Sequence, residues 1–417
     1  MRFRLRMPKP HPLTLRFSIM EILFWAFEGF NLPFVGAYLV SRGLSNTSIG
    51  IIASINALMA ILAPPLWGFV SDRVRSVRKV FIICMIGGMA AIWLIPLSSL
   101  FPQTATFIPL LVVLYALFWC FDNPLQSLMD SWLMQTIKPV PTIQYSNVRL
   151  WGSVGYAIVV SIAGAFYSRF SVQWMFLFYT VMAAIALIYA LFLRSGSFQQ
   201  KEVEHAATPH EKASPLLLIK NYRYVIFVLF VTLLYIPSSI FFTFQLQHFR
   251  HLGGNAGSLG FAMTLSCVGE VIGFLLAWPL SKRFKPMTRL LMASGVFMVR
   301  SLLYLLCRTP FQLGMVHMLQ GTGNAIFLGG MAYFFDYYAP PSLKATSQTL
   351  GYAFSMGGAT IAGSMIGGAL VDKWSYPKLY FAELIFTVIV VGLFMLTLLP
   401  RKKKQPLPPD LEPAKQT

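Results

Sequence analysis

Charged side chains are scarce in this chain, since Asp, Glu, Lys and Arg make up only 11% of its 417 residues. A soluble domain carries roughly 25% charged residues, so the chain has too few to cover a water-exposed surface. Hydrophobic residues make up 56% of the sequence. This composition excludes a soluble enzyme, a disordered chain and a secreted disulfide scaffold, and it favours a protein whose main solvent is lipid.

Cysteine pairs and nucleotide-binding loops are also lacking. The chain has four cysteines and no CxxC pair, so neither a metal site nor a disulfide framework is indicated. It has no GxxxxGK[ST] loop, which argues against ATP hydrolysis within the chain. No loop is long enough for a soluble catalytic domain. We therefore expect no enzyme activity, no cofactor and no metal, and an ion gradient as the energy source.

The net charge of +19 suggests a nucleic-acid partner, but its distribution argues against one. Seven of the 14 acidic residues lie within long apolar stretches, whereas only two of the 33 Lys and Arg residues do, Arg149 and Arg300. The seven are Glu21, Glu28, Asp122, Asp130, Glu270, Asp336 and Glu383. Basic loops that flank acidic spans indicate membrane topology, so we expect no nucleic-acid partner.

Twelve apolar stretches are long enough to cross a bilayer, which takes about 20 residues of helix. Only helices satisfy their backbone groups within each span. The predicted spans are residues 17–40, 47–70, 79–100, 105–133, 148–168, 172–193, 222–248, 257–280, 288–307, 311–338, 346–371 and 377–399. They divide the chain into an N-terminal six-helix bundle (1–193), an inter-bundle loop (194–221), a C-terminal six-helix bundle (222–400) and a disordered tail (401–417).

The predicted fold class is thus an all-α membrane protein with two pseudo-symmetric six-helix bundles. Of the 33 Lys and Arg residues, 25 lie in or next to the loops on the side of the N-terminus, six lie on the other side, and the remaining two are Arg149 and Arg300 within the spans. This bias predicts a cell-membrane protein with both termini in the cytoplasm. Two similar halves of six spans are typical of transporters, with the substrate near the bilayer midplane between the halves. We expect a functional monomer whose partners are a small-molecule substrate, protons and the lipid bilayer.

Acidic residues inside the spans are candidate proton sites, because a charged side chain at the bilayer centre costs ~2.5–3.5 kcal/mol and needs a partner or a function. Glu21 and Glu28 are seven residues apart and share one helix face, which suits a proton carrier, although Glu21 could simply be solvated near the cytoplasmic end. Asp122 precedes Asn123 and Pro124, where proline bends the helix. It could bind a proton or hydrogen-bond the broken helix. Glu383 is expected to be interfacial.

The second half has its own polar groups. His317, Gln320 and Asn324 follow an i, i+3, i+7 pattern and form one stripe on a helix. His317 could carry a proton or simply bond to a neighbour. Glu270 and Arg300 are lone charges on successive spans, and they could form an interhelical pair. Alternatively, Glu270 binds substrate or a proton.

The loop at 68–79, with the sequence GFVSDRVRSVRK, follows the second span. Gly68 stands four residues before Asp72 and lets helices approach closely, so that the acid can meet a helix end or a basic residue. This loop resembles the signature loop of the major facilitator superfamily, G-x-x-x-D-R/K followed by basic residues. The resemblance implies a gating role for Gly68, Asp72 and Arg73. It departs from the family at residues 75–77, where a glycine and one spacer are usual.

A second resemblance covers nearly the whole chain. Asp130-Ser131 and the segment 144–156, QYSNVRLWGSVGY, resemble the hairpin between spans four and five of the lactose permease-like branch, which also includes phenylpropionate permeases. The stretch around Glu270 and the segment Met298-Val299-Arg300 resemble spans eight and nine of that branch. The resemblance implies that Asp130 and Arg149 bind sugar hydroxyls.

The same resemblance implies that Tyr156 stacks on a sugar ring and that Glu270 also holds the sugar. The carry-over is partial, because Gly273 replaces a sugar-binding asparagine of that branch. Gly323 replaces its proton-carrying glutamate, so coupling must use another carboxylate.

The sequence therefore predicts a proton symporter for a small sugar-like solute, working by alternating access. The candidate proton-coupling residues are Glu28, Glu270, Asp122, Arg300 and His317. The alternatives are proton-coupled uptake of an aromatic carboxylate or a nucleoside, proton-driven drug efflux, and a non-transporting receptor or scaffold. An aromatic carboxylate would need a free arginine, and the excess of acids in the spans argues against an anion. The same excess permits a cationic drug.

Overall fold

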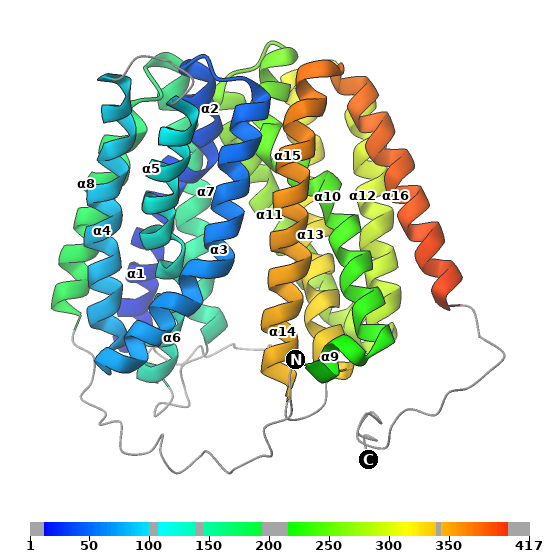
Figure 1. Cartoon of the computed structure of the whole chain (residues 1–417), viewed down its shortest axis with the longest axis horizontal. Helices are drawn as coiled ribbons and strands as arrows, with labels where there is room; N and C mark the ends of the chain where they lie inside the picture. Colours follow the sequence, from blue (N-terminus) through cyan, green and yellow to red (C-terminus); the bar gives the residue numbers. More distant parts are fainter. Residues whose placement is uncertain (1–11, 101–106, 138–144, 194–215, 339–342, 399–417) are drawn as a thin grey trace, which may run out of the picture. The chain divides into compact units, whose positions relative to one another are not determined.

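The structure, a computed structural model, describes residues 12–100, 107–137, 145–193, 216–338 and 343–398, and its regular elements are all helices (Figure 1). The first half comprises α1 (Pro12–Asn31), η1 (Leu32–Phe34), α2 (Val35–Ser41), α3 (Asn46–Val74), α4 (Val77–Leu97), η2 (Ser98–Leu100), α5 (Phe107–Asp122), α6 (Pro124–Ile137), α7 (Tyr145–Arg169) and α8 (Trp174–Phe192). The second half comprises α9 (Leu216–Lys220), α10 (Tyr222–His251), α11 (Ala256–Arg283), α12 (Pro286–Leu306), α13 (Pro310–Tyr338), α14 (Lys344–Tyr352), η5 (Ala353–Gly357), α15 (Gly358–Lys373) and α16 (Tyr376–Leu398).

Among the described residues, eleven helical segments are long and apolar enough to span a membrane. Some of these segments consist of two helices joined across a kink. The helix α13 is 29 residues long but is not among them, and it is the helix that carries His317, Gln320 and Asn324. Each of the twelve predicted stretches overlaps a described helix or a kinked pair of helices. The all-α membrane fold class is therefore confirmed. The predicted tail at 401–417 and most of the loop at 194–221 lie outside the described residues, and α9 occupies part of the remainder of that loop.

The break between α5 and α6 follows from one proline. Pro124 has no backbone N–H, so the carbonyl of Cys120, four residues earlier, loses its helical donor. The indole nitrogen of Trp67 on α3 donates a hydrogen bond to that carbonyl at 2.8 Å. A neighbouring helix thus satisfies the freed group, and the break leaves Asp122 at the end of α5.

The described helices fall into two compact units by their internal contacts. The first unit holds α1, the part of α3 from Leu62, and α4 to α8. The second holds α2, the part of α3 up to Ile61, and α9 to α16. Aromatic rings fill the core of the second unit, where Phe227 stacks on Phe334 with ring centroids 3.3 Å apart.

Within the second unit, the carboxylate of Asp372 at the end of α15 caps the start of α3. It accepts hydrogen bonds from the backbone N–H groups of Asn46 (3.1 Å) and Thr47 (2.9 Å). The side chains of the same two residues donate to it at 2.8 Å and 2.6 Å. A carboxylate is favourable here because the first amides of a helix lack intrahelical acceptors and carry partial positive charge.

Below this cap, α3 and α15 touch backbone to backbone. A Cβ atom on Gly50 would clash with the carbonyl of Ser364. A Cβ atom on Gly368 would lie 2.5 Å from the carbonyl oxygen of Asn46. These glycines are required by the close approach of the two helices, in keeping with the small residues that membrane helix contacts favour.

The turn between α3 and α4 has a left-handed residue. Arg75 has a φ of 52°, and it is the only residue other than glycine with a positive φ in the described part of the chain. Its N–H bonds to the carbonyl of Asp72, and the side chain of Ser76 caps α4 by accepting from the backbone of Lys79. Glycine adopts this conformation without strain, which explains why glycine is usual near this position in the family that the loop resembles.

Candidate functional site

The first polar cluster joins α6 to α7. The hydroxyl of Tyr145 donates a hydrogen bond to Asp130 Oδ1 at 2.9 Å. The guanidinium of Arg149, one helical turn after Tyr145, is near enough to act electrostatically on the Asp130 carboxylate. The loop between α6 and α7 contains residues 138–144, which lie outside the described residues. The structure therefore brings together Asp130 and Arg149, as predicted.

Trp25 on α1 joins this cluster to Tyr156 on α7, the third predicted substrate-binding residue of the first unit. The Arg149 Cζ atom lies 4.6 Å from the centroid of the Trp25 ring, which is cation–π geometry. The rings of Trp25 and Tyr156 meet edge to face, with centroids 5.7 Å apart. An acid, an arginine and two aromatic rings can grip a small polar solute, because the charged groups bind hydroxyls and the rings cover apolar faces.

Glu21 belongs to the same cluster because α7 has a glycine opposite it. A Cβ atom on Gly152 would clash with Trp25 and lie 2.8 Å from Glu21 Oε2. Glu21 is only 1% exposed, so the expectation of simple solvation near the cytoplasmic end is wrong. The charges of Arg149 and Asp130 both act on it. Its two oxygens have no hydrogen-bond partner among the described residues.

The second cluster is buried in the middle of the first unit. The carboxyl groups of Glu28 on α1 and Asp122 on α5 are hydrogen-bonded to each other. The hydroxyl of Tyr179 on α8 donates to Asp122 Oδ1 at 2.6 Å. A hydrogen bond between two carboxyl groups requires that one of them carries a proton. Glu28 and Asp122 thus form a buried carboxyl pair, whereas the predicted grouping of Glu28 with Glu21 is not formed.

Arg300 on α12 is the centre of the polar residues in the second unit. It is 0% exposed. It donates to Ser238 Oγ on α10 at 3.1 Å and to Gln320 Oε1 on α13. The rings of three aromatic side chains, Phe241, Phe297 and Tyr304, lie 5.2–5.7 Å from its Cζ atom.

His317 and Glu270 lie in the same unit. The Nδ1 atom of His317 is 2.9 Å from the carbonyl oxygen of Leu313, and because a carbonyl oxygen only accepts, Nδ1 donates this hydrogen bond. His317 Nε2 is buried and has no hydrogen-bond partner among the described residues. Glu270 on α11 is half-buried, and it acts electrostatically on Tyr235 together with Arg300.

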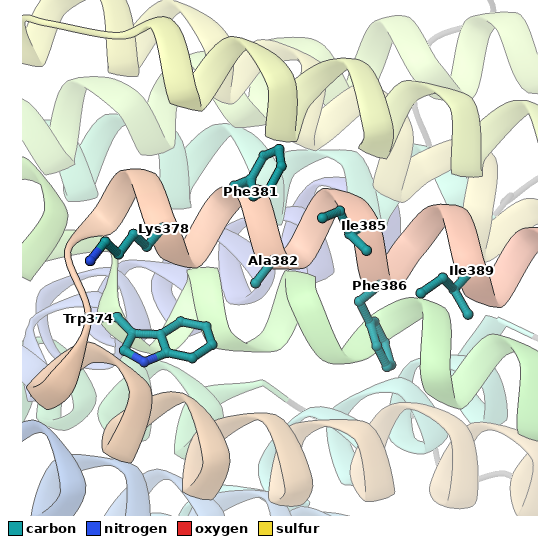
Figure 2. A pocket seen from close by; sticks show the side chains of 7 residues that line it. All are labelled: Trp374, Lys378, Phe381, Ala382, Ile385, Phe386 and Ile389. Carbon is teal, nitrogen blue, oxygen red and sulfur yellow. The ribbon is translucent and has the colours of Figure 1, made fainter.

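Glu383 on α16 is not interfacial, contrary to the prediction. It is 4% exposed and lies on the buried stripe of α16. That stripe comprises Tyr380, Glu383, Thr387, Val390 and Phe394. The outward side of the same helix lines a shallow apolar groove of about 500 Å³ that runs from Trp374 to Ile389 (Figure 2). Helical rotation, rather than depth along the span, therefore decides the environment of Glu383.

The residues of the resembled gating loop lie at the end of α3. Asp72 and Arg73 are exposed. A Cβ atom built on Gly68 meets no atom within 4 Å, so the close helix contact expected there is not present among the described residues. On α15, Gly368 also stands four residues before an acid, Asp372. This glycine does make a close helix contact, with the start of α3.

Sequence reasoning missed two residues that complete these clusters, Trp25 and Tyr179, and it did not anticipate the burial of Glu383. Trp25 gave no signal because it is one of many aromatic residues in the spans. Tyr179 likewise lies in a long apolar run that contains no charged residue. Glu383 had a signal, since it stands three residues after Tyr380 and four before Thr387 and so shares a polar stripe with them.

Comparison with known proteins agrees with this fold. Residues 14–382 match the MFS_1 like family. The maltose permease of Geobacillus stearothermophilus is 25% identical over 92% of this chain and 93% of its own length. The nucleoside permease NupG of Escherichia coli is 23% identical over 87% of this chain and 89% of its own length.

A crystal structure of nucleoside transporter NupG superposes with a TM-score of 0.80 at 19% identity, covering 94% of this chain and all of that one. At this identity the likeness shows the fold alone, and that fold is the one of the major facilitator transporters. The family match extends over most of the chain, from α1 to α16. The protein is therefore a member of the MFS_1 like family of the major facilitator superfamily, and it is an integral membrane, secondary active transporter of small solutes rather than an enzyme.

Proposed function

We propose that this protein takes up a small, neutral, sugar-like solute together with protons across the cell membrane. The observation that carries the proposal is the cluster of Asp130, Arg149, Trp25 and Tyr156, which combines charged hydroxyl-binding groups with two aromatic rings. Asp130 and Arg149 compensate each other's charge, and with Glu21 in the same cluster no positive charge is left over for an anionic solute. The similarity to a maltose permease and to a raffinose permease supports a sugar.

Proton coupling is assigned to Glu28 and Asp122. Their mutual hydrogen bond holds one proton, and the Tyr179 hydroxyl supplies a second donor to Asp122. Loss of the proton would leave two neighbouring negative charges in a buried site, which is unfavourable. The site therefore changes its hydrogen bonds when it releases the proton, and that change can be linked to movement of the helices α1 and α5.

The branch, membrane and topology belong to the same proposal. The hairpin at Asp130 to Tyr156 supports placement in the lactose permease-like branch. The bias of Lys and Arg residues supports a cell-membrane location with both termini in the cytoplasm. An alternating-access transporter of this size needs no second copy, and we propose that it functions as a monomer.

A nucleoside is the second candidate substrate. Two aromatic rings, Trp25 and Tyr156, are more than a single sugar ring requires, and they could contact a nucleobase as well. The similarity to nucleoside permease NupG supports this class.

Uptake assays separate these candidates. Cells that express the protein and lack their own maltose, raffinose and nucleoside uptake would be given radiolabelled maltose, raffinose or uridine, an aromatic carboxylate, or a cationic dye. We expect uptake of a sugar and alkalinisation of the medium as protons enter with it. Uptake of uridine alone selects the nucleoside. Uptake of the aromatic carboxylate alone, or energy-dependent expulsion of the dye, contradicts the proposal.

Two substitutions test the assigned residues. Arg149→Ala should abolish uptake of the substrate so identified, whereas Arg169→Ala, on the same helix but exposed, should not. Glu28→Gln should abolish accumulation against a gradient while leaving exchange of internal for external substrate. Unchanged uptake by Arg149→Ala would overturn the binding assignment, and retained accumulation by Glu28→Gln would overturn the coupling assignment.

A further inference from the structure

The side chain of Glu383 is buried and accepts no hydrogen bond from the described residues. Neither of its oxygens has a hydrogen-bond partner among the described residues. Buried polar groups in folded proteins almost always have a partner, so an acid without one marks a place that a proton or a water molecule occupies. Its helix α16 packs against α12, α10 and α15.

Charged and titratable groups approach Glu383 from these helices. They are Arg300 and Tyr304 on α12 and Tyr380 on α16 itself. Tyr380 in turn is hydrogen-bonded to His248 on α10, with 2.6 Å between its hydroxyl and Nδ1. The positive charge of Arg300 acts directly on the Glu383 carboxyl group. Both groups nevertheless remain without a hydrogen bond to each other, since the Arg300 guanidinium donates to Ser238 and Gln320.

Arg300 does not depend on Glu383 for its hydrogen bonds. It contacts Ser238, Gln320 and three aromatic rings, and none of these contacts involves Glu383. An ionised Glu383 would have its charge compensated by the nearby guanidinium, and a protonated Glu383 would leave the guanidinium with these other partners. Such an arrangement suits a reversible proton site within a membrane span.

Further uncommitted polar atoms lie around Arg300. Arg300 Nε, the Tyr304 hydroxyl and His317 Nε2 are buried without a hydrogen-bond partner in the described residues. The rings of Tyr304 and His317 are 6.1 Å apart, and those of Tyr304 and Tyr380 are 5.2 Å apart. The polar atoms therefore extend from Glu383 across α12 to α13.

From this geometry we infer that Glu383 is a proton-binding site of the second unit, separate from the Glu28–Asp122 site of the first. Hydronium in the surrounding water transfers its proton to one carboxylate oxygen, so that one O–H bond of hydronium breaks and one O–H bond on Glu383 forms, and the net charge of the Glu383–Arg300 group rises from zero to +1. The role of this proton in transport rests on the proposed function, whereas its binding does not.

Infrared difference spectroscopy tests proton binding without a substrate. Full-length protein purified in detergent would be cycled between about pH 5 and about pH 9, a range above the ordinary carboxyl pKa of ~4, so that exposed carboxyl groups stay ionised throughout. The C=O stretch of protonated carboxyl groups would be recorded at each pH. We expect Glu383→Gln to remove one pH-dependent band, Glu383→Asp to shift it in frequency, and Arg300→Gln to move its pH midpoint. An unchanged set of bands in Glu383→Gln would overturn the inference.

Two controls keep the result interpretable. Glu28→Gln should remove a different band from the one that Glu383→Gln removes. If Glu28→Gln loses a band and Glu383→Gln loses none, the proposed coupling site is supported and the inference about Glu383 is overturned. If Glu383→Gln does not yield folded protein, Glu383→Asp retains the carboxyl group and should still shift the band. A Glu383→Asp spectrum identical to that of the unaltered protein would overturn the inference.

Discussion

The cap that Asp372 provides for α3 should contribute measurably to stability. Asp372→Ala removes an acceptor of four hydrogen bonds to Asn46 and Thr47. Loss of a helix N-cap costs ~0.5–2 kcal/mol, and loss of a charge that complements the helix dipole at an exposed site costs ~0.3–1 kcal/mol. Because Asp372 is exposed and screened by solvent, we expect a total of about 1–2 kcal/mol.

Thermal unfolding of the purified protein measures this loss. A change of this size lowers the melting temperature of a large domain by ~2–6 °C. Asp372→Asn keeps one acceptor oxygen but loses the charge and the acceptor of two bonds, so its effect should be smaller, and only the part due to the charge should weaken at high salt. Lys373→Ala, at the next and equally exposed position, is the matched control. If Asp372→Ala melts at the same temperature as Lys373→Ala, the cap contributes nothing and the reasoning is wrong.

Two other contacts give predictions in the first unit. Tyr179→Phe leaves Asp122 without its 2.6 Å donor, which should lower the free energy of unfolding by ~1–3 kcal/mol. The same substitution should impair accumulation of the substrate more than exchange of internal for external substrate. Equal effects on accumulation and exchange would contradict the coupling role. Trp67→Phe leaves the Cys120 carbonyl without its donor and should destabilise the protein by ~1–3 kcal/mol, measured by thermal unfolding. Pro124→Ala restores a helical N–H for that carbonyl, so the cost of Trp67→Phe should shrink in the double variant, and simple additivity would refute the explanation.

The spans and the helix break could be predicted from the sequence because each depends on local chemistry. Twenty apolar residues require a membrane helix, and Pro124 removes a hydrogen bond whatever surrounds it. The hairpin residues Asp130 and Arg149 were also predictable, since a short loop holds their two helices together. These features can be predicted from the sequence because the residues that interact are close to each other in the chain.

Partnerships between distant helices could not be predicted in the same way. Glu21 and Glu28 share a helix face, but seven residues of helix separate them by ~10 Å along the axis, so their side chains pair with other helices. Glu28 meets Asp122 on α5, and Glu21 lies beside Trp25 and Arg149. Hydropathy likewise gives the depth of Glu383 but not its rotation about the axis of α16.

The glycine contacts between α3 and α15 have a mechanical consequence. Gly50 and Gly368 lie against bare backbone, so no side chain of their own stands between the helices at these two positions. Polar contacts join α3 to α15 as well: the Asp372 cap, and a hydrogen bond of 3.2 Å from Ser54 Oγ to the carbonyl of Ile361. At the glycines themselves, parting the helices would uncover little apolar area, at ~25 cal/mol for each Å². The strength of these few hydrogen bonds would then set how readily the two helices separate.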